Sequence, residues 1–274
     1  MPDDAQTRGF QPDSEKPQAI AAPAGKDDAT MEAIAVRKRR PVQGGYARGE
    51  ETRLRIIQTA IPLFARLGFD SASTREIASE AGVNPPALQY YFDSKEGLYR
   101  ACAEYIADQA SLAMDPVIEH AERLLQDKDA GGDAAIDCYC AILGGLADLL
   151  FCRPEAASWS PMLTREDAGL GQSIAMAVLR ERFIDRFHAA CTGLLARILG
   201  GSADSPEIVL RMMAINGQLK AFHLGRGPIL ACLGWSEFSP EHGRLIKSVV
   251  VDQTRALLTA EHRARAKTPL PSPL

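Results

Sequence analysis

The stretch 73–98 constrains the fold most, because it places a helix-start signal on each side of one glycine. Ser73 precedes a glutamate by three residues, which is the spacing of a capping box and predicts a short helix. Gly82 then provides the backbone freedom that a tight turn requires. Asn84, followed by two prolines, predicts a second helix that we expect to run to about Tyr91. Two short helices joined by such a turn form a helix-turn-helix.

Helical spacing also dominates the rest of the chain. Apolar residues recur three or four positions apart, and no alternating β-branched run bounded by turns stands out. One such stripe comprises Ile57, Ile61, Phe64 and Leu67. Gly68 is expected to end this helix, and Pro62 to kink it. The sequence therefore predicts an all-α protein.

Capping side chains in front of prolines mark three further helix starts, at Asp115, Ser205 and Ser239. Helices are expected over 133–151, 168–199, 206–224 and 240–258. Prolines from Pro269 onward indicate a frayed C-terminal end.

Charge is distributed unevenly along a chain whose formal net charge is only −4. Residues 1–36 carry 3 basic and 7 acidic side chains and few large apolar ones, so we expect a disordered acidic tail. Residues 37–100 carry 11 basic and 7 acidic side chains, beginning with a flexible basic arm over 37–50. The remainder carries 17 basic and 21 acidic side chains. A basic run is often only a solvated segment, but beside a compact helical pattern it favours nucleic acid as a partner.

Three motifs within 52–99 together carry a resemblance to a known family. They read RIIQTAIPLFARLGFDSAST, REIASEAGVN and ALQYYFDSKEGLY. With them the chain resembles the DNA-binding domain of the TetR family of transcriptional regulators. The segments MLTREDAGL, FIDRFHAACTGLLARILG and INGQLKAFHLGRGPILACLGW resemble the CecR-like C-terminal domain found in part of that family.

The resemblance implies two folded parts. Residues 51–100 would form a three-helix, TetR-type helix-turn-helix DNA-binding domain. Residues 101–260 would form a helical effector-binding and dimerisation bundle, followed by a flexible tail at 261–274. The function implied is a repressor that a small-molecule effector releases from a palindromic operator. The unliganded homodimer would hold two recognition helices about 34 Å apart, to match successive major grooves.

The predicted DNA contacts divide into phosphate contacts and base contacts. A helix N-terminus attracts phosphate, and a lysine adds a point charge. The amide of Gln89, which stands where the family often has tyrosine, can pair with an adenine, and small apolar groups can touch a thymine methyl. Either tyrosine could donate to phosphate, with packing as the alternative, whereas Leu88 and Phe92 are expected in the core. The predicted contact residues are Ser73, Thr74, Asn84, Pro86, Ala87, Gln89, Tyr90, Tyr91 and Lys95.

The C-terminal half offers candidates for a ligand pocket and a dimer interface. The pocket candidates are Tyr139, Trp159, Met162, Arg165, Phe183, Phe187, His188, Phe222 and His223. Aromatic and methionine side chains at helical spacing are also typical of an ordinary core. By the resemblance, helices 206–224 and 240–258 would pair across a dimer, where Ala214, Gly217 and Ala221 allow close approach. Packing within one chain is the alternative.

Other classes of protein are less well supported. An α-helical enzyme lacks a paired nucleophile and base or a nucleotide loop here, and no metal ligand spacing or cofactor motif is present. A helical interaction module without DNA binding is disfavoured by the intact motif residues. The apolar stretch 134–152 is interrupted by Asp137 and Asp148, which indicates a buried helix rather than a membrane span. Six cysteines without a Cys-x-x-Cys pair, and an N-terminus without a signal pattern, predict a cytoplasmic protein.

Overall fold

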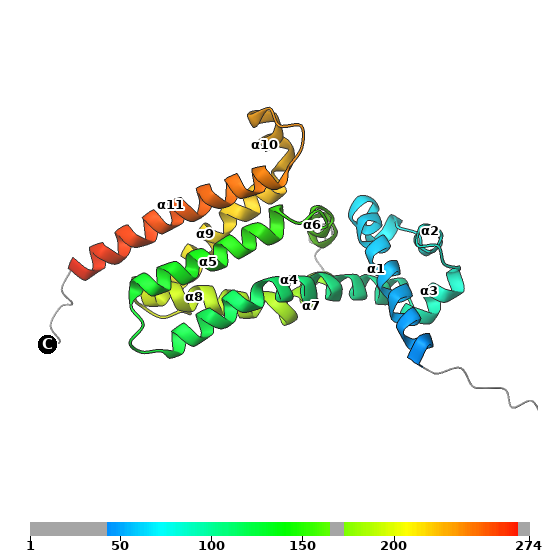
Figure 1. Ribbon diagram of the computed structural model, residues 1–274, viewed down its shortest axis with the longest axis horizontal. Helices are drawn as coiled ribbons and strands as arrows, with labels where there is room; N and C mark the ends of the chain where they lie inside the picture. The colour runs from blue at the N-terminus through cyan, green and yellow to red at the C-terminus, as the bar shows by residue number, and fades with distance from the viewer. Residues whose placement is uncertain (1–42, 165–172, 268–274) are drawn as a thin grey trace, which may run out of the picture. The chain divides into compact units, whose positions relative to one another are not determined.

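The computed structural model describes residues 43–164 and 173–267, and every regular element in those ranges is helical (Figure 1). The all-α prediction is confirmed. In chain order the elements are α1 Gln43–Ser71, α2 Thr74–Glu80, α3 Pro85–Phe92, α4 Lys95–Gln126, α5 Gly132–Phe151, α6 Ala156–Thr164, α7 Ile174–Leu179, the π-helical turn η2 Arg180–Ile184, α8 Asp185–Leu199, α9 Pro206–Leu224, α10 Arg226–Leu233 and α11 Pro240–Lys267.

The first helix buries the predicted apolar stripe and breaks at Gly68, where the sequence predicts its end, whereas the kink predicted at Pro62 is absent. Ile57, Ile61 and Phe64 are at most 4% exposed. Gly68 has φ 81° and ψ 168°, which interrupts α1 and which a side chain with Cβ would resist. The break therefore lies at Gly68, and Pro62 keeps helical dihedrals on the exposed face.

The helix also begins at Gln43, so the part of the predicted arm from residue 43 onward is helical. The Arg48 carbonyl accepts a hydrogen bond from Thr52 Oγ1 at 2.8 Å.

The fourth helix runs without a break through the start predicted at Asp115. Pro116 lies inside α4 on its exposed side, and the carbonyl that loses its partner belongs to Leu112, which is 71% exposed. Water can satisfy that carbonyl, so the proline is tolerated there. Asp115 does not cap a helix and instead pairs with Arg186 of α8 at 2.7 Å. The boundary expected at 100/101 also falls inside α4, which is therefore shared by both predicted parts.

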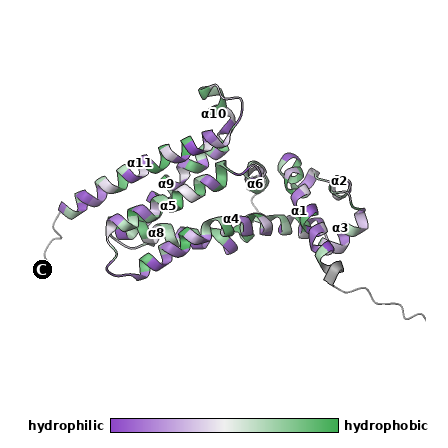
Figure 2. Cartoon of the chain, viewed as in Figure 1, coloured by the Kyte–Doolittle hydropathy of each residue, from purple (hydrophilic) through white to green (hydrophobic). Residues whose placement is uncertain are grey.

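The fifth helix forms the centre of the C-terminal bundle. It packs against α4, α8 and α11. By length and composition α5 could cross a membrane, but 61% of its apolar window is buried inside the protein, as expected for a core helix. The two acidic residues that interrupt it face α11, where Asp148 pairs with Lys247 at 2.6 Å and Asp137 pairs with Arg255. Figure 2 shows hydrophobic and hydrophilic residues alternating along the neighbouring α4 and α11, as helices with one buried face require.

The helix predicted over 168–199 is divided in the structure. Residues 165–172 lie outside the described ranges, Ser173 caps α7, and a π-helical turn separates α7 from α8. This turn packs along α4. Its Arg182 pairs with Asp108 at 2.9 Å and with Glu104 at 3.4 Å.

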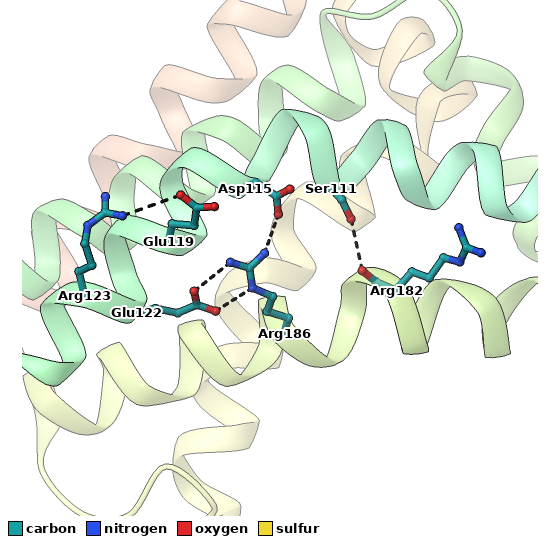
Figure 3. A network of polar contacts seen from close by, with 7 residues as sticks. All are labelled: Ser111, Asp115, Glu119, Glu122, Arg123, Arg182 and Arg186. Atoms are coloured by element: carbon teal, nitrogen blue, oxygen red, sulfur yellow. Dashed lines mark hydrogen bonds and ion pairs between the residues drawn. The ribbon is translucent and has the colours of Figure 1, made fainter.

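One turn further, in α8, Arg186 makes a second and more extensive contact with α4. Its guanidinium reaches both carboxylate oxygens of Glu122, at 2.7 and 2.9 Å, as well as Asp115 (Figure 3). Arginine matches a carboxylate with two parallel N–H donors, which fixes the direction of the contact as well as its strength. Two arginines from η2 and α8 therefore hold α4 along its middle.

The last two long helices confirm the predicted starts at Ser205 and Ser239, but the final helix ends later than Leu258. α11 continues to Lys267, so the predicted flexible tail begins as helix. His262 Nδ1 donates to the Ile198 carbonyl at 2.9 Å, and the Arg265 guanidinium lies over Gly200, where a Cβ would collide with it. These contacts with the end of α8 hold the extra turns in place.

Candidate functional site

The region 73–95 forms the predicted helix-turn-helix. Ser73 caps α2 by accepting from the Arg75 amide at 3.3 Å, and Asn84 caps α3 by accepting from the Ala87 amide at 2.9 Å. Between them Gly82 has φ +66°, the left-handed conformation expected of the turn. Arg55 of α1 donates from Nε to the Ala81 carbonyl at 3.1 Å, which satisfies the end of α2.

The third helix has one buried side and one exposed side. Leu88 and Phe92 are buried, as predicted, and fix the rotation of the helix. Pro86, Gln89 and Tyr90 are exposed, Tyr90 by 81%. The exposed side chains are thus those predicted to contact DNA. Gln89 Nε2 donates one N–H to the Asp93 carbonyl, and the amide has a second N–H and an oxygen with which to contact a base.

The start of α4 is fitted closely against the end of α3. Ser94 caps α4 by accepting from the Gly97 amide at 3.0 Å. A Cβ at position 97 would overlap the Phe92 carbonyl oxygen, so only glycine allows this approach. Gly97 is not among the predicted site residues, although its place inside a first helical turn, where glycine is unfavourable, is a signal in the sequence.

Two of the predicted contact residues also have packing roles. Lys95 Nζ donates to the Asp70 carbonyl at 3.0 Å and lies 4.8 Å from the centre of the Phe69 ring. Tyr91 is half-buried and packs edge-on against Tyr90 at 5.3 Å. An ammonium has three donors, so Lys95 keeps donors for a phosphate.

Thr74, another predicted contact residue, is half-buried in the first turn of α2. The run 37–40 lies outside the described residues.

Large apolar side chains lie exposed on both α9 and α11, and we call this surface the α9–α11 face. Its members recur at helical spacing and comprise Leu210, Met213 and Leu224 of α9 and Leu245, Val249 and Leu257 of α11. A Cβ at Gly217, in the middle of α9, would meet nothing within 4 Å. The small residues of α9 therefore face open space within one chain. Exposed apolar patches of this kind mark association surfaces.

Most of the predicted pocket residues are packed in the core. Tyr139, Trp159, Met162, Phe183, Phe187 and His223 are buried, Phe222 is half-buried, His188 is exposed and Arg165 lies outside the described residues. The Tyr139 hydroxyl donates to Asn216 Oδ1 at 3.1 Å, and the Phe183 and Phe187 rings stack at 5.6 Å.

Cavities occur elsewhere in the described part of the chain. One of about 420 Å³ lies between α1 and α4, with Leu54 and Tyr105 among acidic residues. Another of about 550 Å³ lies where α8 leads into α9, beside Arg211 and Glu261. Neither is lined by a predicted pocket residue, and the pocket assignment stays a prediction. Among residues 43–164 and 173–267, no three His, Cys, Asp or Glu side chains are grouped as metal ligands would be.

Comparison with known proteins identifies the family. The family described as bacterial regulatory proteins, tetR family, matches residues 56–102, and the C-terminal domain of the HTH-type transcriptional dual regulator CecR matches residues 135–261. CecR from Shigella flexneri is 34% identical over 203 residues, which cover 74% of this chain and 89% of that protein. The chain belongs to the TetR family of transcriptional regulators.

Solved TetR-family structures share the fold at low identity. A TetR-family regulator from Mesorhizobium loti superposes with a TM-score of 0.51 at 15% identity, covering 78% of this chain and 97% of that one. AibR, solved in complex with isovaleryl coenzyme A and operator DNA, has the same TM-score at 16% identity, covering 75% and 97%. The match to the family's DNA-binding region contains α2, α3 and the first turns of α4. TetR-family proteins of this kind are regulators and not enzymes.

Proposed function

We propose that this regulator is a repressor that binds a palindromic operator as a homodimer and leaves it when a small molecule binds. The exposed face of α3, with Pro86, Gln89 and Tyr90 held outward by buried Leu88 and Phe92, carries this proposal. A helix presented in this way can enter a major groove with its N-terminal end leading. DNA binding would reside in residues 51–100 and effector binding in residues 101–260, as the sequence predicts.

Dimerisation is supported by the α9–α11 face. Its six large apolar residues are between 47% and 66% exposed in one chain, and burying them against a second copy would remove that area from water. A two-fold dimer would present two copies of α3, which is why the operator is expected to be a palindrome.

Effector release is supported by the way the two parts are joined. α4 begins beside the recognition helix and continues into the bundle, so a ligand that changes the bundle can change the placement of α3. AibR holds a small molecule and operator DNA in one complex, and we propose that this chain likewise has both kinds of site. A coupling of roughly 1–3 kcal/mol would change DNA affinity about 5- to 150-fold. The protein would act in the cytoplasm, where the DNA lies.

Activation is the second candidate, because the Shigella relative is named a dual regulator. Binding to the DNA upstream of the protein's own gene, followed by transcription in vitro from the same fragment, separates the two. Less transcript with protein present supports repression, and more transcript contradicts it.

Gln89→Ala provides the test of base reading. This variant should bind the upstream fragment at least tenfold more weakly and bind unrelated DNA almost unchanged, because only base contacts depend on sequence. Ser79→Ala, at an exposed position of α2, serves as the matched control. Equal losses on both DNAs would mean that Gln89 does not read a base.

A further inference from the structure

A buried histidine stands without a complete set of partners where α9 ends. His223 is 6% exposed, and its Nδ1 has no hydrogen-bond partner. An unpartnered buried polar atom costs roughly 1–3 kcal/mol, so native proteins rarely retain one without a use. The imidazole also makes a hydrogen bond with the Leu150 backbone and lies edge-on to the Phe151 ring, with the two ring centres 5.9 Å apart.

Close to it lies an arginine without a counter-charge. Arg226 begins α10, and no carboxylate in the described part of the chain pairs with it. Its Cζ lies 4.7 Å from the centre of the Phe238 ring. Burial lowers the pKa of this guanidinium, whereas a nearby carboxylate would have raised it. The aromatic ring favours the cation but does not neutralise it.

The surroundings of the pair favour a negative ligand. Burial and the charge of Arg226 lower the pKa of His223 to about 4, against the effect of Leu150, so the imidazole is neutral at neutral pH. Among the described residues no carboxylate pairs with this positive charge, to which the N-terminus of α10 adds a partial charge. A Cβ at Gly227 would meet nothing within 4 Å, so the first turn of α10 is open to a ligand.

We propose that His223 and Arg226 form a binding site for an oxyanion, the carboxylate or phosphate group of a small molecule. The guanidinium offers paired N–H donors that match such a group. A bound anion would offset the repulsion between the two side chains, so that His223 takes up a proton and donates from Nδ1. Both unsatisfied groups gain a partner in this way. The inference rests on the proposed function only in that the bound oxyanion compound would be the effector.

The experiment follows the imidazole directly, on the full-length protein without DNA. Protein with ¹⁵N-labelled histidine rings is titrated at pH 6.5 with sodium benzoate and, separately, with sodium phosphate, while sodium chloride holds the ionic strength constant. The ring signals of His223 are assigned with the His223→Phe variant, and those of the exposed His120 serve as an internal reference. We expect a saturable shift of the His223 signals toward the imidazolium form, with little change at His120.

Variants then test the partner. Arg226→Gln should raise the dissociation constant at least tenfold, and Arg226→Lys several-fold, because lysine keeps the charge but loses the paired donors. Arg244→Gln, at an exposed arginine of α11 that pairs with Glu241, should leave it within twofold. Circular dichroism verifies that each variant is folded. If Arg226→Gln does not fold, Arg226→Lys still tests the geometry of the site.

Saturation by benzoate identifies a carboxylate ligand and saturation by phosphate a phosphate ligand, and either supports the site. The proposal is overturned if neither anion shifts the His223 signals, or if Arg226→Lys binds as tightly as the wild type. Release of operator DNA by the same anions is measured separately, so a failure of the proposed function is distinguishable from a failure of this site.

Discussion

The buried imidazole of His223 predicts a specific loss of stability in mild acid. Its pKa is about 4 in the folded protein, against 6.5 for an unperturbed histidine, because burial and Arg226 disfavour the charged ring. Above pH 6.5 the ring is neutral in the folded and unfolded chains alike. Between pH 6.5 and 4 only the unfolded chain binds the proton, so acid favours unfolding in this window.

The size of the effect follows from the same two values. One pKa unit corresponds to 1.36 kcal/mol, so His223 should lower the free energy of unfolding by about 2 kcal/mol between pH 7 and pH 5, and by about 3 kcal/mol at pH 4. The variant His223→Phe keeps a ring beside Phe151 but cannot titrate. The difference in stability between wild type and variant should therefore change by about 2 kcal/mol over those two pH units.

Urea unfolding followed by circular dichroism at pH 7, 6 and 5 measures this difference. The buffers should be amine hydrochlorides without carboxylate or phosphate, because an oxyanion at Arg226 would raise the pKa that is being measured. His120→Gln, at an exposed position of α4, serves as the matched control. A difference between wild type and His223→Phe that stays constant from pH 7 to pH 5 would refute the reasoning.

Three other changes have definite expected outcomes. Lys95→Ala should reduce the slope of log affinity against log salt by about one and should weaken binding to all DNA sequences, and an unchanged slope would exclude a phosphate contact. Arg186→Gln should lower the free energy of unfolding by about 1 kcal/mol in urea, since its partly exposed ion pairs are screened, and no loss would show them to be neutral. Met213→Glu should convert a dimer into a monomer in sedimentation at micromolar concentration, with Lys128→Glu, at an exposed position between α4 and α5, as control.

The helix-turn-helix could be predicted from sequence because its signals are local. Ser73, Gly82 and Asn84 act within four residues of their own positions, and each does in the structure what its residue type favours. Leu88 and Phe92 follow from helical spacing for the same reason.

The helix start predicted at Asp115 is wrong, because Asp115 contacts a residue distant in the sequence and does not cap a helix. An aspartate before a proline marks a helix start only when the aspartate is free to cap, and here Arg186, 71 positions further along the chain, binds it. The late end of α11 has the same origin, since His262 and Arg265 pack against the end of α8. The sequence near these residues does not indicate that they have such distant partners.

The candidate ligand residues show a further limit. Aromatic side chains in 101–260 were chosen by type, and type does not distinguish a pocket wall from a core. In the structure, pocket candidates and core residues differ in whether their polar and charged atoms have partners. Tyr139 has its hydroxyl partner in Asn216, whereas His223 has a nitrogen without a partner, and the Arg226 beside it has no counter-charge, among residues 43–164 and 173–267. Arg226 itself could not be selected from sequence, because whether an arginine lacks a carboxylate is a property of the folded chain.

The arrangement of ion pairs on α4 limits how a ligand could act on DNA binding. Arg182 and Arg186 hold the middle of α4 from η2 and α8, while Lys95 at its start holds the end of α1 through the Asp70 carbonyl. A displacement of α8 must therefore either carry α4 with it or break these pairs. Exposed pairs contribute at most about 1 kcal/mol each, which is comparable with the roughly 1–3 kcal/mol that an effector needs to change DNA affinity. If Arg186→Gln weakens this link, an effector should release DNA less completely from that variant while binding it equally well. That combination would separate transmission through α4 from recognition of the ligand.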